Sequence, residues 1–206
     1  MLWRHGRTAW NGENRFQGHS DIPLDEVGRA QAARGAALLA GLGPHALASS
    51  DLQRARDTAA ELARLTGLEV AVDAGLRETS GGRWEGLLAT EIAATDAEAY
   101  AAWRSGADVA AGGAETRGQV ADRATAAVRR LLETVSDEET LVVATHGGTT
   151  RALMGRMLQL PSDRWGVLGG LANCHWSVLE EGRAGGWRLA EHNAGSLPEP
   201  VVGDDL

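Results

Sequence analysis

The feature that most constrains the fold is an uninterrupted apolar run in the last third of the chain. Residues 141–144 read Leu-Val-Val-Ala, and the run ends after Thr145 at His146-Gly147-Gly148. A strand that is apolar at every position is buried on both faces, as in the parallel sheets of α/β proteins. We therefore predict a central, buried strand over residues 140–145.

The rest of the chain alternates between short apolar runs and longer stretches with helical spacing. Residues 25–42 carry apolar side chains at three- and four-residue intervals, and Gly43-Pro44 then ends the helix. A second helix ends at Thr66, and we expect Ser49-Ser50-Asp51 to supply its N-cap. The same signals predict strands at 45–48, 68–72, 174–180 and 187–191, and helices at 115–135 and 149–158. This pattern predicts an α/β fold, a three-layer sandwich whose mostly parallel central sheet is flanked by helices.

The length of 206 residues favours a single domain over 1–206. Within it, residues 81–113 are rich in glycine at both ends and in alanine between, without a clear strand. We expect a small helical cap inserted beside the sheet, and a plain pair of surface helices fits the pattern equally well. Residues 198–206 are acidic and contain two prolines, so we expect a flexible tail.

Charge and composition exclude several classes of protein. The net charge of −8 argues against general binding of nucleic acid, which requires a basic surface. No stretch approaches about 18 uninterrupted apolar residues, so we expect no membrane-spanning segment. The single cysteine, Cys174, excludes an intramolecular disulfide and fits a reducing, cytoplasmic location. We expect Cys174 to be a small core residue.

Two apolar runs end in histidine followed by glycine. One is Leu2-Trp3-Arg4-His5-Gly6, and the other is the predicted central strand with His146. Residues just past the carboxyl ends of adjacent parallel strands line the crevice where ligands bind, and the helix after Gly148 directs free amides at it. This arrangement favours an anion. Two satisfied structural histidines are the alternative, and a metal site is less favoured because no carboxylate or third histidine stands at ligand spacing.

Residues 4–11, Arg-His-Gly-Arg-Thr-Ala-Trp-Asn, resemble the signature that opens the histidine phosphatase superfamily, which includes the cofactor-dependent phosphoglycerate mutases. Further matches follow in the family's order at residues 15–18, 21–24, 28–32, 49–59, 76–78, 84–86 and 145–148. The resemblance covers most of the chain. It implies a phosphoglycerate mutase-like fold and a reaction that needs neither a metal nor another cofactor.

The resemblance also implies roles for individual residues. His5 would attack phosphorus to give a phosphohistidine, and Arg4 and Arg54 would hold the phosphoryl oxygens, which suits forked guanidinium groups. His146, in its cationic form, would donate a hydrogen bond to the same oxygens. Glu78 would protonate the leaving oxygen and then deprotonate the attacking water. The alternative for Glu78 is a surface carboxylate paired with the neighbouring arginine, Arg77.

Other matched positions are expected to contact the substrate. Asn11 matches a phosphate contact, Gln17 and Gly18 match a loop that touches the substrate, and Gly147 would donate its backbone amide. Arg7 stands where many members carry Glu or Gln, so it either adds positive charge at the pocket rim or points outward.

The resemblance leaves three functions to compare. The mutases of the family carry paired basic residues in a longer insertion, whereas residues 81–113 contain only Arg83 and Arg104 and no basic pair. This favours a phosphatase acting on a small phosphomonoester over a mutase. A catalytically weak module that binds phosphorylated ligands is the third alternative, and the presence of all five matched catalytic residues disfavours it. A homodimer is common in such folds, but nothing in the sequence demands one.

Later segments resemble one group of proteins within the superfamily. Residues 168–173, 175–177 and 187–189 resemble actinobacterial members of the superfamily that dephosphorylate glucosyl-3-phosphoglycerate. A sugar could stack on Trp84, Trp103 or Trp165, although tryptophan is more often a core residue.

Overall fold

A six-stranded sheet forms the centre of the fold in the computed structural model, which describes residues 1–182 and 185–195. The strand order is β3-β2-β4-β1-β5-β6. The strands are β1 (Leu2–Arg4), β2 (Ala46–Ser49), β3 (Val70–Val72), β4 (Leu141–Thr145), β5 (Trp176–Glu181) and β6 (Trp187–Ala194). β3, β2, β4 and β1 run parallel, whereas β5 pairs antiparallel with both β1 and β6. The mostly parallel sheet is thus confirmed, and residues 183–184, between β5 and β6, lie outside the described residues.

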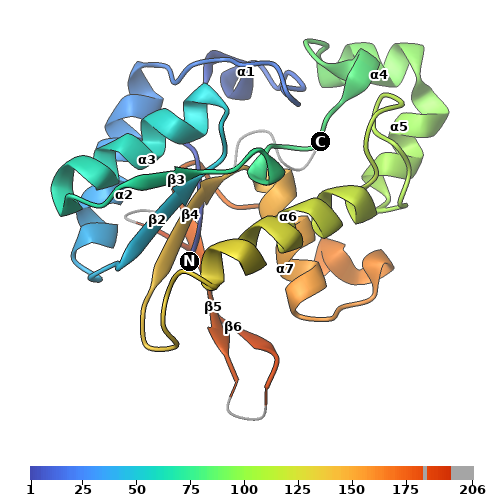
Figure 1. Ribbon diagram of the computed structural model, residues 1–206. Helices are drawn as coiled ribbons and strands as arrows, with labels where there is room; N and C mark the ends of the chain where they lie inside the picture. The colour runs from blue at the N-terminus through green and yellow to red at the C-terminus, as the bar shows by residue number, and fades with distance from the viewer. Residues whose placement is uncertain (183–184, 196–206) are drawn as a thin grey trace.

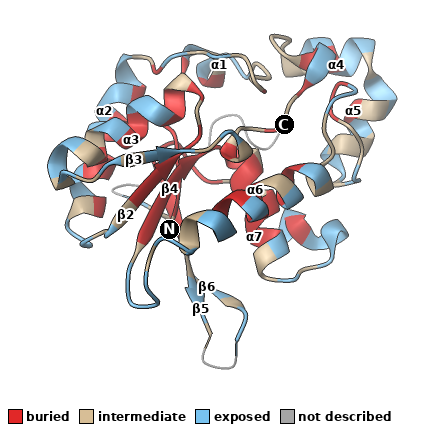
Figure 2. Cartoon of the chain, viewed as in Figure 1, coloured by how far each residue is buried: buried red, intermediate tan, exposed pale blue. Residues whose placement is uncertain are grey.

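Helices cover both faces of this sheet (Figure 1). α2 (Glu26–Ala40) and α3 (Gln53–Thr66) pack together on one face, and α6 (Arg117–Leu132) and α7 (Gly147–Met157) pack together on the other. Successive residues of a strand point to opposite faces, so Trp3 joins the core under α2 and α3, whereas Leu2 joins the core under α6 and α7. β4 is buried along its whole length, which explains its uninterrupted apolar sequence (Figure 2). The three-layer sandwich is confirmed.

Local signals set two helix ends, of which the end of α3 at Thr66 was predicted. Asp25 caps α2 by accepting a hydrogen bond from the Gly28 amide at 2.7 Å. Gly67 ends α3 with a φ of 74°, a conformation that glycine adopts without strain. Cys174 is buried in the core under α2 and α3, as expected.

The predicted N-cap of α3 is wrong. The cap residue is Leu52, which makes no side-chain hydrogen bond. Ser49 is instead the last residue of β2, and the Ser50 hydroxyl lies 2.9 Å from a ring nitrogen of His146. The same hydroxyl accepts from the Leu52 amide at 3.3 Å, so Ser50 combines a local contact at the start of α3 with one to a residue 96 positions away.

Residues 81–113, called the cap from here on, contain two short helices and no strand. α4 (Ala89–Thr95) and α5 (Ala97–Arg104) follow the 3-10 turn η2 (Gly82–Trp84). They enclose an aromatic cluster of Trp84, Tyr100, Trp103 and Phe16. Trp84 anchors this cluster by donating to the Asp96 carboxylate at 2.8 Å. The division of the chain into one domain with this insertion stays a prediction, and the expected tail at 198–206 lies outside the described residues.

The shorter elements lie outside the two main layers of helices. They are α1 (Ala9–Gly12) and the 3-10 segments η1 (Ala74–Leu76) and η3 (Ser162–Val167). α1 and the cap lie over the carboxyl ends of the parallel strands (Figure 1). Across the described part of the chain, no helix combines the length and the apolar character that crossing a membrane requires.

We predict that Gly28→Ala destabilises the protein. Gly28 lies in the first turn of α2, where a Cβ would overlap the backbone carbonyl of Arg7. Alanine is the better helix former by about 1 kcal/mol, but backbone atoms cannot yield cheaply, so we expect a net loss of about 1–3 kcal/mol in unfolding free energy by urea denaturation. Gly12→Ala is the matched control because a Cβ there meets no other atom within 4 Å. Equal stabilities for the two variants would contradict the prediction.

Candidate active site

The two histidines meet at the carboxyl edge of the sheet. β1 and β4 are parallel neighbours in which Arg4 pairs with Thr145, so His5 and His146 each follow directly on their strand. The His5 amide donates to the Thr145 carbonyl at 2.9 Å. The two rings are buried, with their centroids 5.1 Å apart and their planes inclined by 59°. The strand order thus brings together two residues 141 positions apart in the chain.

His5 is held in one tautomer. Its Nδ1 lies 2.7 Å from the Gly6 carbonyl oxygen, which can only accept, so Nδ1 carries the proton and Nε2 has a free lone pair. Burial, followed by the positive charges of Arg54 and Arg4, holds the pKa of His5 well below its usual 6.5. The ring is therefore neutral at pH 7, which is the state in which an imidazole can act as a nucleophile.

His146 is oriented by Ser50. Its Nε2 lies 2.9 Å from the Ser50 hydroxyl, whereas its buried Nδ1 has no partner among the described residues. Burial and then the charge of Arg54 hold the pKa of His146 well below 6.5. The cationic form that the resemblance implies therefore does not hold for this ring alone at pH 7. A dianionic phosphate beside Nδ1 would favour the cation by direct charge attraction.

Arg54 is a fully buried cation in the first turn of α3. Its Nη1 and Nη2 donate to the carbonyls of Ser20 and Gly18 at 2.8 and 2.9 Å. Burial lowers its pKa to about 10, so the guanidinium stays charged at pH 7. In the described part of the chain, no carboxylate lies within ion-pair distance of it, and its Nε makes no hydrogen bond. The charges of Glu78 and Asp21 act on Arg54 only from beyond ion-pair distance. A buried charge without a direct ion pair is costly, which favours an anionic ligand here.

Arg4 lies beside this group at the end of β1. Its side chain is buried, and its Nη1 donates to the Leu171 carbonyl at 2.5 Å. Arg4, His5 and Arg54 line one cavity at the carboxyl edge of the sheet.

Glu78 enters the cavity from the loop after η1. Its carboxylate accepts hydrogen bonds from the amides of Gly148 at 3.1 Å and Thr149 at 3.0 Å, in the first turn of α7. The amide of Thr79 donates to the same carboxylate at 2.8 Å. The alternative of a surface pair with Arg77 is wrong, because Arg77 binds Asp51 at 2.6 Å. A helix N-terminus thus fixes this carboxylate at the cavity wall.

Asn11, Gln17 and Gly18 line the same cavity. The Asn11 side-chain oxygen accepts from the Thr8 amide at 3.1 Å, and Gln17 accepts from the Thr8 hydroxyl at 3.0 Å. Thr8 therefore orients both side chains.

Gly147 begins α7, so its amide is one of those that no helix carbonyl satisfies. Arg7 does not line the cavity. It binds Asp25 at the start of α2 with Nε 2.8 Å from the carboxylate, so of its two predicted placements the outward one holds.

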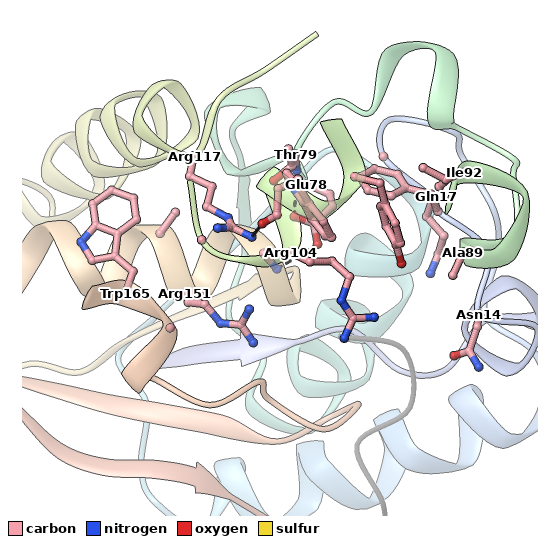
Figure 3. A pocket seen from close by; sticks show the side chains of 18 of the residues that line it. Asn14, Gln17, Glu78, Thr79, Ala89, Ile92, Arg104, Arg117, Arg151 and Trp165 are labelled. Carbon is pink, nitrogen blue, oxygen red and sulfur yellow. Dashed lines mark hydrogen bonds between the residues drawn. The ribbon is translucent and has the colours of Figure 1, made fainter. Parts of the chain in front are cut away.

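The cavity continues from His5 to the cap, and Figure 3 shows three of the arginines that sequence analysis did not place there. They come from separate elements: Arg104 from α5, Arg117 from α6 and Arg151 from α7. Arg151 stands five residues after His146, and this closeness in the sequence could have indicated that it lies near the site.

The three tryptophans considered for sugar stacking separate into two groups. Trp103 and Trp165 line the cavity, whereas Trp84 is buried inside the cap. Ser50, which orients His146, was also missed as a site residue. The sequence feature that came closest to indicating Ser50 was its position just after a predicted strand.

Comparison with known proteins agrees with this geometry. The family model described as histidine phosphatase superfamily (branch 1) matches residues 1–195. The chain belongs to this superfamily. It is 39% identical to a glucosyl-3-phosphoglycerate phosphatase of Mycolicibacterium vanbaalenii over 94% of this chain and 93% of that one. It is 37% identical to a metal-independent phosphoserine phosphatase of Arabidopsis thaliana over 79% of this chain and 69% of that one.

A solved structure gives the same result. The complex of mycobacterial glucosyl-3-phosphoglycerate phosphatase with VO3 superposes with a TM-score of 0.89 at 41% identity, covering 94% of this chain and 98% of that one. The phosphoglycerate mutase-like fold is thereby confirmed. This superfamily member is a phosphatase, a hydrolase, rather than a mutase or a catalytically weak binding module.

We predict that the two buried histidines make stability depend on pH. Each has a pKa below 6.5 in the fold, so between that value and 6.5 the unfolded chain binds protons that the folded chain does not. Unfolding free energy should fall as pH drops below 6.5, by at most about 1.4 kcal/mol per pH unit for each ring. Urea titrations of the wild type and of His146→Asn between pH 7.5 and 5 should show a shallower slope for the variant. Identical slopes would count against the buried, neutral His146.

Proposed function

We propose that this histidine phosphatase hydrolyses phosphomonoesters in two steps through a phosphohistidine on His5. The observation that carries the proposal is the neutral His5 ring, with Nε2 free, beside the buried Arg54, which makes no direct ion pair among the described residues. Such a cation favours a phosphoryl group at the position where the nucleophile can reach it.

In the first step, Nε2 of His5 attacks phosphorus and the ester P–O bond breaks. Arg4 and Arg54 bind the phosphoryl oxygens, and His146 donates from Nδ1 once the dianion favours its protonated form. The carboxyl group of Glu78 gives its proton to the leaving alkoxide, so an alcohol departs.

In the second step, water attacks the phosphohistidine. The Glu78 carboxylate takes a proton from this water, the P–N bond breaks, and inorganic phosphate is released with His5 restored. The amides of Thr79, Gly148 and Thr149 keep the carboxylate in one position for both proton transfers. Asn11, Gln17, Gly18 and the Gly147 amide complete the contacts to the phosphate and the substrate.

For the substrate, we propose a small anionic or sugar-linked phosphate, with glucosyl-3-phosphoglycerate as the first ester to test. The identity of 39% to a phosphatase named for that substrate supports this choice. The Trp103 indole and the Tyr100 phenol stack at 6.2 Å in the cap, and both line the cavity, where they offer an apolar surface to a sugar ring.

We further propose a cytoplasmic location, which suits the buried Cys174. A homodimer remains one arrangement to test by light scattering.

We predict phosphate release from such esters in excess EDTA. His5→Ala should reduce the rate below detection because the nucleophile is lost, and Glu78→Gln should lower kcat by roughly 10²- to 10⁴-fold because the proton donor is lost. The measurement is inorganic phosphate released from glucosyl-3-phosphoglycerate, 3-phosphoglycerate and phosphoserine. His45→Ala, an exposed histidine at the opposite edge of the sheet from the site, is the matched control.

A trapping experiment separates this mechanism from direct attack by water. Acid-labile, alkali-stable label should appear on the protein from a radioactive phosphoester and be missing from His5→Ala. Turnover that survives in His5→Ala would overturn the mechanism. Isomerisation of 3-phosphoglycerate without phosphate release would contradict a hydrolase.

A further inference from the structure

Two cations lie close together in the part of the cavity beyond Glu78. Arg117 is the first residue of α6, and Arg151 lies in the second turn of α7. Both line the cavity, and their side chains are drawn in Figure 3. Burial, followed by the charge of Arg151, lowers the pKa of Arg117. The two guanidinium groups are therefore near enough to repel one another.

Neither cation is neutralised by a carboxylate among the described residues. Arg117 donates to the Trp103 carbonyl at 2.7 Å and stacks 5.1 Å from that indole ring, contacts that position it without cancelling its charge. The Nε of Arg151 is buried and makes no hydrogen bond.

Two further acidic groups close to the arginines are occupied or exposed. Asp108, whose charge acts on Arg117, accepts from the Gly118 amide at 2.9 Å. Asp163 lines the cavity but is exposed and lies 3.9 Å from Arg164. The two half-buried arginines thus keep an excess of positive charge in a protein whose net charge is −8.

Position along α7 relates these cations to the reaction. Gly148, which holds the Glu78 carboxylate, and Arg151 are three residues apart and share one helix face, with a rise of about 4.5 Å between them. Glu78 protonates the leaving oxygen in the proposed mechanism. The arginines therefore lie on the side of the leaving group rather than on that of the phosphoryl oxygens.

We propose that Arg117 and Arg151 form a second anion subsite that binds a carboxylate on the leaving group of the phosphoester. This inference rests on the proposed phosphatase function. A guanidinium group binds a carboxylate through two parallel hydrogen bonds, and two such groups on different helices can enclose it. Both residues lie outside the cap, so the subsite does not need the basic pair that the cap lacks. Arg104, exposed at the rim, contributes charge only.

The test compares esters that differ only in the carboxylate. The pairs are phosphoserine with phosphoethanolamine, and 3-phosphoglycerate with glycerol 3-phosphate. Arg117→Gln and Arg151→Gln should each lower kcat/KM for the carboxylated ester by roughly 10- to 100-fold, mainly through KM. Their kcat/KM for the ester without a carboxylate should stay within about twofold of wild type. Arg164→Gln, an exposed neighbour that does not line the cavity, should leave both values unchanged.

The proposal is overturned if either variant loses activity equally on both members of a pair, or if neither variant loses any. Near-ultraviolet circular dichroism checks that the variants are folded, and Arg151→Lys should recover part of the loss because the charge is kept.

A binding experiment tests this subsite independently of the proposed function. In the His5→Ala background, tryptophan fluorescence should report tighter binding of 3-phosphoglycerate than of glycerol 3-phosphate or inorganic phosphate, since Trp103 contacts Arg117. Adding Arg151→Gln should abolish this preference. If the wild type releases no phosphate from any ester, the proposed function fails while this result still supports the subsite. Equal binding of the three probes would overturn it.

Discussion

The parallel pairing of β1 with β4 is the interaction on which the site depends. Its register places Arg4 opposite Thr145, and the next residue of each chain segment is therefore a histidine facing the same edge. The pairing is fixed by burial, because Trp3 and Val142 pack in one core while Leu2 and Val143 pack in the other. A slip of one residue would exchange these faces and separate the rings. The apolar layers thus secure the geometry of the polar edge.

The site concentrates positive charge in a protein that is acidic overall. Arg54 is held by the carbonyls of Ser20 and Gly18, which orient the guanidinium without neutralising it. Its charge, added to the burial, keeps His5 and His146 neutral. Backbone amides at the start of α7, rather than an arginine side chain, hold the Glu78 carboxylate. Arg54 and Glu78 are thus anchored separately. The space between them can hold a phosphate ester whose leaving oxygen faces Glu78.

Local sequence predicts the elements whose signals are contained within them. Asp25 and Gly67 mark helix ends because each acts on a backbone group within a few residues. Ser50 differs, since its hydroxyl accepts from the amide of Leu52, the N-cap residue of α3, and also contacts His146, 96 positions away. The sequence left the placement of the Arg7 side chain undecided because its carboxylate partner, Asp25, lies 18 residues away. The errors and open questions thus fall on side chains whose partners are distant in the chain.

The sequence alone determined the class of fold and the order of strands and helices along the chain. It also determined the motif residues later found around one edge of the sheet. Periodicity and strand-ending histidines are local patterns. Only the tertiary structure decided which ring nitrogen of His5 carries no proton, where the Glu78 carboxylate is anchored, and that Arg117 and Arg151 share the cavity. These depend on burial and on contacts between α6, α7, the cap and the sheet. Residues that meet only after the layers pack carry no common signal along the chain.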